Sequence, residues 1–311
     1  MNNKKIADFI IEYFADKGVD NMFVVYGAAN GDLIDAFTRI KKTKYIAVMH
    51  EQAGGFAAEG YAKVKENKIP GVTIATSGPG GMNLVTPIGN FYYDSIPGIF
   101  ITGQINSRFM RNDPDIRQVG FQETDIVGIC KPITKYSKLI TDPYSIKYEL
   151  DKALHLATSG RPGPVLLDIP MDLQKKIIDI DKLYSFDNST VSKIKSSDTE
   201  IKIDKYLNDL NKSKRPTILI GGGVRNADAI DELIELGDLI GIPMYPTWNA
   251  LDVVTSDLPF YAGRVGTFGG AGRNFGIQNS DLLLGIGTRI SGRITGGNIH
   301  SFAREAKKYV V

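Results

Sequence analysis

The sequence predicts an α/β protein made of two doubly wound parallel-sheet domains. Short apolar runs alternate with amphipathic helical segments along most of the 311 residues, which is the pattern of β–α–β units. Several of these runs end in glycine-rich turns, and the chain carries 33 glycines. Turns of this kind at the carboxyl ends of parallel strands bring the backbone close to a ligand. We therefore expect ligand sites at those sheet edges.

Composition narrows the class of protein. A net charge of +2 gives no basic field for nucleic acid. Cys130 is the single cysteine, so no internal disulfide forms and a reducing compartment is expected. The N-terminus does not have the form of a signal peptide, and no segment approaches the roughly 20 apolar residues of a membrane span. We expect a soluble, cytoplasmic protein with no nucleic-acid or membrane partner.

The first part of the chain predicts a complete α/β domain over residues 1–172. Residues 106–123 are polar and irregular, and a loop of that length is typical of a functional segment. The apolar patterns predict strands at 22–26, 44–49, 72–75, 98–102 and 164–169, and helices at 6–17, 32–40, 50–65, from 82 onward, and at 147–158.

Residues 173–200 lose this pattern and are predicted to be a linker, and a second α/β domain follows over 201–311. Strands are expected at 217–220, 281–286 and from 309, and helices at 227–240 and 301–307. The sequence stops within the pattern of this second domain, which we expect to be incomplete, so we expect the N-terminal part of a longer polypeptide.

The stretch from His50 to Lys65 follows a strand and has helical spacing of small and apolar residues, so it places Glu51 at a strand-to-helix turn. An acidic residue there lies at the ligand-binding edge of a parallel sheet. The alternative is that Glu51 only complements the positive end of a helix dipole.

Several familiar motifs are absent. The chain has no G-x-x-x-x-G-K-[ST] loop and no G-x-S-x-G elbow, and its three histidines lack metal-ligand spacing. Gly221-Gly222-Gly223 lies between a strand and a helix without the full dinucleotide fingerprint, so it is either a nucleotide-binding turn or a close backbone turn. The sequence therefore has none of the motifs that usually identify a hydrolase, a metalloenzyme or a kinase, and no metal ligands are assigned in this chain.

Eight motifs together carry a resemblance that covers nearly the whole chain. In chain order they are V-Y-G-A-A-N-G (25–31), H-E-Q-A (50–53), A-A-E-G-Y-A (57–62), T-S-G-P-G (76–80), D-S-I-P (94–97), I-T-G-Q (101–104), F-Q-E-T-D (121–125) and S-G-R-P-G-P-V (159–165). This order resembles the thiamine-diphosphate-dependent acetolactate synthase family. It implies that the chain holds the pyrimidine-binding domain and most of the central domain, without the third domain that binds the diphosphate and Mg²⁺.

The resemblance implies roles for residues of the first domain. Glu51 would hydrogen-bond a pyrimidine nitrogen of thiamine diphosphate and favour the imino form that removes the thiazolium proton. Gln122 would be the second catalytic residue, because its amide can donate to a developing oxyanion. The remaining matched positions are the cofactor contacts Gly27, Ala28, Pro79 and Asn83, and the substrate-pocket residue Phe121.

In the second domain the resemblance implies an FAD site with a structural, not a redox, role. Relatives read G-M-H-G and R-F-D-D-R where this chain has G-T-F-G (266–269) and R-I-S-G-R (289–293), so an empty or adenine-only site is the alternative. Arg293 is expected to contact either a substrate carboxylate or phosphate, or the flavin. The matched flavin positions are Arg161, Gly221, Gly222, Gly223, Thr247 and Arg289.

The function implied by the resemblance is a carboligase that decarboxylates pyruvate and transfers the two-carbon unit to a keto acceptor, either a 2-keto acid or a keto-sugar. Relatives form their site between subunits, so a homodimer or homotetramer is expected, and this chain alone should not turn over substrate. Two other functions stay open, a thiamine-dependent 2-keto acid decarboxylase and a non-catalytic binding fragment.

Overall fold

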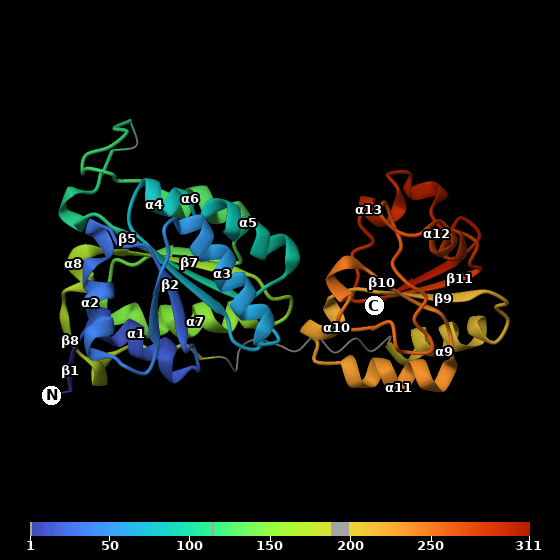
Figure 1. The fold of residues 1–311 in the computed structure, drawn as a ribbon. Coiled ribbons are helices and arrows are strands. Elements are labelled where there is room, and N and C mark those ends of the chain that lie inside the picture. Colours follow the sequence, from blue (N-terminus) through green and yellow to red (C-terminus); the bar gives the residue numbers. More distant parts are fainter. Residues whose placement is uncertain (1, 114, 188–198) are drawn as a thin grey trace. The chain divides into compact units, whose positions relative to one another are not determined.

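The computed structural model describes residues 2–113, 115–187 and 199–311. The chain forms two compact units, Met1–Val191 (unit 1) and Ser192–Val311 (unit 2), each with its own parallel sheet (Figure 1). None of the described helices is long and apolar enough to cross a membrane.

Unit 1 follows the predicted alternation of strands and helices. Its helix α1 ends near Gly18, whose φ of +87° is a backbone conformation suited to glycine. The elements are β1 (Asn3–Lys5), α1 (Ile6–Asp16), β2 (Asn21–Val24), α2 (Gly31–Arg39), β3 (Lys44–Ala47), α3 (Glu51–Val64), β4 (Gly71–Ala75), α4 (Pro79–Met82), α5 (Val85–Asp94), β5 (Gly98–Gln104), α6 (Ile126–Cys130), β6 (Tyr136–Leu139), α7 (Ile146–Thr158), β7 (Pro164–Pro170), α8 (Met171–Gln174) and β8 (Ile177–Asp179).

The main sheet of unit 1 has the strand order β3-β2-β4-β5-β7-β6, and all neighbouring strands are parallel. After β2 the chain adds β3 on one side and then β4 on the other, so the strand order reverses between β2 and β4. Ligands of open α/β sheets bind at such a switch point, beyond the carboxyl ends of the strands.

Helices cover both faces of this sheet (Figure 1). Along β5, Ile99 and Ile101 pack into one core with α1, α2 and α7, whereas Phe100 faces a second core with α3, α5 and α6. Both cores are fully buried, which explains why β5 is a continuous apolar run and does not alternate with polar residues. The doubly wound fold predicted for this part of the chain is confirmed.

Unit 2 has the same doubly wound arrangement around a smaller sheet of strand order β10-β9-β11-β12, in which all neighbouring strands are parallel. Its switch point lies between β9 and β11. One face of the sheet packs on α9 and α11 and the other on α12. The elements are α9 (Thr199–Leu210), β9 (Pro216–Ile220), α10 (Gly223–Asn226), α11 (Ile230–Ile240), β10 (Met244–Pro246), α12 (Ala271–Gln278), β11 (Leu282–Ile286), α13 (Gly292–Thr295) and β12 (Lys307–Val310).

The expected helix at 301–307 is wrong. A short 3₁₀ turn at Ile299–Ser301 is followed by turns, because Phe302 and Ala303 are drawn into the core and Lys307 already pairs with β11 as the start of β12. Edge strands β6 and β10, only a few residues long, were not expected from the sequence pattern.

The expected linker at 173–200 also differs in part from the structure. Ile177–Asp179 forms β8, which pairs antiparallel with β1 through Asn3 and Asp179, so this stretch belongs to unit 1. Residues 188–198 lie outside the described residues.

Candidate functional site

The turns after β2 and β4 meet at the switch point of unit 1. A Cβ added to Gly27 would lie 2.4 Å from the Cβ of Thr76, so only glycine fits at this close approach. The Ala29 amide donates to the Thr76 hydroxyl at 3.2 Å. Asn30 closes the β2 turn, because its Oδ1 accepts from the Gly27 amide at 2.8 Å and its Nδ2 donates to the Val25 carbonyl at 2.9 Å.

The end of β5 joins the same edge. A Cβ on Gly103 would lie 2.0 Å from the carbonyl oxygen of Ala29. The expectation that the carboxyl ends of several strands meet here therefore holds for β2, β4 and β5. Ala28 itself lies exposed on the β2 turn.

Glu51 is the first residue of α3, directly after the cap residue His50, whose Nδ1 accepts from the Gln52 amide. Although it begins a helix on the sheet edge, its side chain is buried, with the residue 8% exposed. Its Oε2 accepts a hydrogen bond from Asn83 Nδ2 at 2.9 Å. The Glu51 carboxyl is therefore held at the sheet edge by a specific amide, an arrangement compatible with both the ligand-binding role and the helix-dipole role.

The turn after β4 brings Gln122 into the same neighbourhood. A Cβ on Gly80 would lie 3.0 Å from Glu51 Oε1, and a Cβ on Gly78 would lie 2.8 Å from both the Cβ and the carbonyl oxygen of Gln122. Pro79, between these glycines, begins α4. Two glycines of this turn therefore face the two predicted catalytic residues. Gly78 faces Gln122, and Gly80 faces Glu51.

Phe121 lies next to Gln122 and is 84% exposed. Its side chain is therefore not enclosed by the described residues of the chain. Other exposed apolar side chains also occur on the segments that surround Glu51, namely Tyr26, Met49 and Met82.

A second carboxyl–amide pair holds α3 further along its length. Glu59, also 8% exposed, accepts from Asn90 Nδ2 at 2.6 Å and pairs with Lys63. The pairs Glu51–Asn83 and Glu59–Asn90 therefore tie α3 to the α4–α5 segment at two points, which fixes the direction of the Glu51 side chain.

The glycine-rich turn of unit 2 is explained by its own packing. A Cβ on Gly221 would lie 2.1 Å from the Gly287 carbonyl oxygen, and a Cβ on Gly223 would lie 2.7 Å from the Gly287 Cα. A Cβ on Gly222 would lie 2.7 Å from the Asn249 carbonyl oxygen. These contacts support the close backbone turn, which was one of the two alternatives for this motif.

Beside this turn, unit 2 carries an aromatic stack. Trp248 and Phe268 stack with ring centroids 5.4 Å apart, and the Arg293 guanidinium lies 5.3 Å from the Trp248 ring centroid. The Thr267 amide donates to the Arg293 carbonyl, so the loop and the arginine hold each other. Both aromatic rings are exposed, and an exposed stack with a guanidinium suits a planar ring that carries phosphates.

The other predicted flavin positions are dispersed. The Thr247 amide donates to the Ile220 carbonyl at 2.8 Å, which places it next to the glycine-rich turn. Arg289 follows β11. Arg161 belongs to unit 1, where its Nε donates to the Ser95 hydroxyl at 2.7 Å. Trp248 and Phe268 were not predicted as site residues, because the two stacked residues lie 20 positions apart in the sequence.

Comparison with known families agrees with this geometry. Two family models match the chain: the N-terminal TPP binding domain of thiamine pyrophosphate enzymes over residues 4–129, and the central domain of the same enzymes over residues 203–311. Thiamine pyrophosphate is another name for thiamine diphosphate. The chain therefore belongs to the thiamine pyrophosphate enzyme family and carries its N-terminal and central domains.

Within that family the chain is similar to acetolactate synthases. It is 37% identical over 301 residues to the acetolactate synthase large subunit of Corynebacterium glutamicum, covering 97% of this chain and 46% of that protein. It is 35% identical over 309 residues to the chloroplastic acetolactate synthase of Arabidopsis thaliana, covering 98% and 44%. A probable acetolactate synthase large subunit of Methanocaldococcus jannaschii is 36% identical over 307 residues, covering 97% and 50%. The chain spans about half the length of these relatives, and the family resemblance of its motifs is confirmed.

Proposed function

We propose that this chain supplies the pyrimidine half-site of a thiamine-pyrophosphate-dependent carboligase of the acetolactate synthase type. The observation that carries the proposal is the buried Glu51 carboxyl, which Asn83 holds at the switch point of a parallel sheet. The relatives named above supply the class of reaction. In that reaction pyruvate loses carbon dioxide and its two-carbon unit is transferred to a keto acceptor.

Each residue of the half-site has a distinct task. The bound coenzyme supplies a nucleophilic carbon that its own pyrimidine ring helps to generate. Glu51 holds a proton at a nitrogen of that ring, and the Asn83 amide keeps the carboxyl pointed at it. Gly27, Ala28 and Pro79 would form the backbone surface under the ring, and the absence of a side chain at Gly80 leaves room beside Glu51 Oε1. The Gln122 amide donates to oxygen as negative charge develops there.

The exposed apolar side chains support a site completed by a second subunit. Tyr26 (68% exposed), Met49 (100%) and Phe121 (84%) lie on segments that surround Glu51, and a second subunit would cover them in the proposed assembly. The proposal is a homodimer or homotetramer in the cytoplasm. Mg²⁺ and the diphosphate would be held by the third domain of the relatives.

A structural FAD is proposed for unit 2. Trp248, Phe268 and Arg293 form the surface that suits its planar ring, and the position of Arg293 on Trp248 favours a flavin contact over a substrate carboxylate. The changed 266–269 and 289–293 segments favour an acceptor other than that of a housekeeping acetolactate synthase, and a keto-sugar stands beside a 2-keto acid as the candidate.

The test uses the protein expressed from the complete reading frame, supplied with pyruvate, thiamine pyrophosphate and Mg²⁺. Acetolactate or another carboligation product is expected, and it should be lost in Glu51→Gln but retained in Glu59→Gln, the matched change on the same helix. Acetaldehyde as the only product would replace the proposal with a decarboxylase. Unchanged activity in Glu51→Gln would refute the role of this residue.

A further inference from the structure

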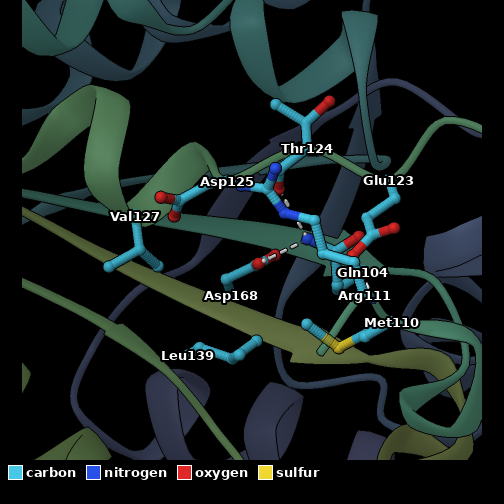
Figure 2. Close-up of a pocket in the computed structure, with 9 residues that line it drawn as sticks. All are labelled: Gln104, Met110, Arg111, Glu123, Thr124, Asp125, Val127, Leu139 and Asp168. Carbon is cyan, nitrogen blue, oxygen red and sulfur yellow. Dashed lines mark hydrogen bonds between the residues drawn. The ribbon is translucent and has the colours of Figure 1, made fainter. Parts of the chain in front are cut away.

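The described residues of the loop between β5 and α6, 105–113 and 115–125, are organised by buried or partly buried carboxylates. At its start the amide and hydroxyl of Ser107 donate to Asp172 at 2.8 and 2.6 Å. Its middle and end are held by Glu123 and Asp168, which line one cavity of about 140 Å³ together with Gln104 and Arg111 (Figure 2).

Glu123 closes the loop upon itself. Its side chain is buried, and its two oxygens accept separate backbone hydrogen bonds, from the Arg111 amide at 2.6 Å and from the Val119 amide at 2.9 Å. Its own carbonyl accepts from Gln118 Nε2 at 2.9 Å, and its amide donates to the Gly120 carbonyl at 3.0 Å. One side chain therefore clasps two distant points of the loop.

The end of the loop is attached to the sheet next to this clasp. Gln104 Nε2 donates to the Thr124 carbonyl at 2.9 Å and to Asp168 at 2.8 Å (Figure 2). The Thr102 hydroxyl donates to Asp168 at 2.7 Å. Glu123 therefore directly precedes Thr124, which is anchored to the sheet, and its side chain binds the amides of Arg111 and Val119.

Gln122 is the residue directly before the clasp, and its backbone is strained. Its φ of +63° is in the left-handed region, which is unfavourable for a residue other than glycine. The conformation sets Gln122 against Gly78, two residues before the glycine that faces Glu51. Such a conformation persists only where neighbouring contacts enforce it.

We propose that Glu123 is a positioning residue for Gln122: its carboxylate holds the loop in the form that places Gln122 against the turn shared with Glu51. This inference rests on the proposed function, because it gives Gln122 its catalytic task. Only a carboxylate provides an acceptor for each of the two amides. A glutamine offers a single oxygen, and its NH₂ group would face the second N–H.

The first test measures hydrogen exchange of single amides in the 311-residue chain. In Glu123→Gln we expect at least one of the Arg111 and Val119 amides to exchange at least tenfold faster, because glutamine has a single oxygen for the two. Exchange in β4 and β5 should stay unchanged, which shows that the domain is folded. Glu149→Gln is the control, because Glu149 is an equally buried carboxyl that accepts instead from the Tyr136 hydroxyl. Unchanged exchange at both amides would overturn the clasp.

The second test measures kinetics in the full-length protein. Glu123→Gln should lower kcat at least tenfold, with KM for pyruvate and Kd for thiamine pyrophosphate changed by less than about threefold. Because Glu123 acts through Gln122, adding Glu123→Gln to Gln122→Ala should cause no further loss. Multiplying effects in the double variant would refute the positioning role. No turnover by the unmodified protein would count against the proposed function, and the exchange rates would still decide whether Glu123 holds the loop.

Discussion

Asp168 allows a quantitative prediction, because it is a buried acid at the centre of unit 1. It lies on β7, is 2% exposed, and accepts from Thr102 and Gln104. Burial raises its pKa from the ordinary 3.8 to about 7, the two hydrogen bonds oppose that rise, and the charge of Asp125 adds to it. The experiment is the substitution Asp168→Asn, because asparagine does not ionise and so removes the pH-dependent contribution of this side chain to stability.

The sign and size follow from linkage. Between the unfolded pKa of 3.8 and the folded pKa of about 7, the folded state binds a proton that the unfolded state lacks, so stability falls as pH rises. From about pH 5 to above pH 7 this loss amounts to about 3 kcal/mol, at 1.36 kcal/mol per pH unit. The asparagine variant lacks this loss. Its free energy of unfolding, relative to the unmodified protein, should therefore improve by about 3 kcal/mol between about pH 5 and pH 8.5.

The chain provides a reporter for each unit. Cys130 is the single cysteine and is buried in unit 1, so its labelling by a dithiodipyridine pulse at increasing urea follows the unfolding of unit 1. Trp248 is the single tryptophan and lies in unit 2, so its fluorescence follows that unit and should show no difference between the two proteins.

The comparison between two pH values cancels the hydrogen bond that asparagine cannot make to both partners, which costs about 1–3 kcal/mol at either pH. A difference between variant and unmodified protein that is the same at both pH values would refute the reasoning. A shift confined to Trp248 fluorescence would do so as well.

Two other predictions concern the turn after β4. Gly78→Ala should destabilise unit 1 by about 1–3 kcal/mol in the same labelling assay, because the φ of Gly78 is +60° and the new methyl group has no room. Gly60→Ala is the control, because Gly60 lies on α3 with open space around it. It should be neutral or stabilising by up to about 1 kcal/mol. Equal effects of the two changes would contradict this. Asn83→Ala should lower carboligation by the full-length protein at least tenfold, while Asn90→Ala, which removes the other amide that binds a carboxyl of α3, should change it less than threefold. Similar losses in both would remove the special role of the first pair.

Much of the architecture follows from local pattern. The apolar runs of β4, β5, β7 and β9 and the helix after Glu51 are long or distinctive enough to predict, because burial on both faces of a parallel sheet leaves continuous apolar stretches. Short edge strands such as β6 and β10 lack that signal. The 301–307 segment has helical spacing, but tertiary packing of Phe302 decides its conformation.

The candidate site also has parts that the sequence predicted and parts that it did not. The local pattern predicted that Glu51 lies at a strand-to-helix turn, whereas the roles of Glu51, Gly27 and Pro79 were implied by the family resemblance of their motifs. The bond from Asn83 to Glu51 joins residues 32 positions apart, and the clasp at Glu123 depends on how a long loop folds back. Such contacts arise only when elements dock, so the sequence pattern does not contain them.

The central claim is that the Glu51 carboxyl activates the coenzyme. Its most direct test is the rate at which the thiazolium proton of bound thiamine pyrophosphate exchanges for deuterium in the full-length protein. Glu51→Gln should slow this exchange at least 100-fold, the lower limit typical of a lost acid–base group, while coenzyme is still bound and Glu59→Gln exchanges normally. An exchange rate in Glu51→Gln within about threefold of the unmodified protein would contradict the claim.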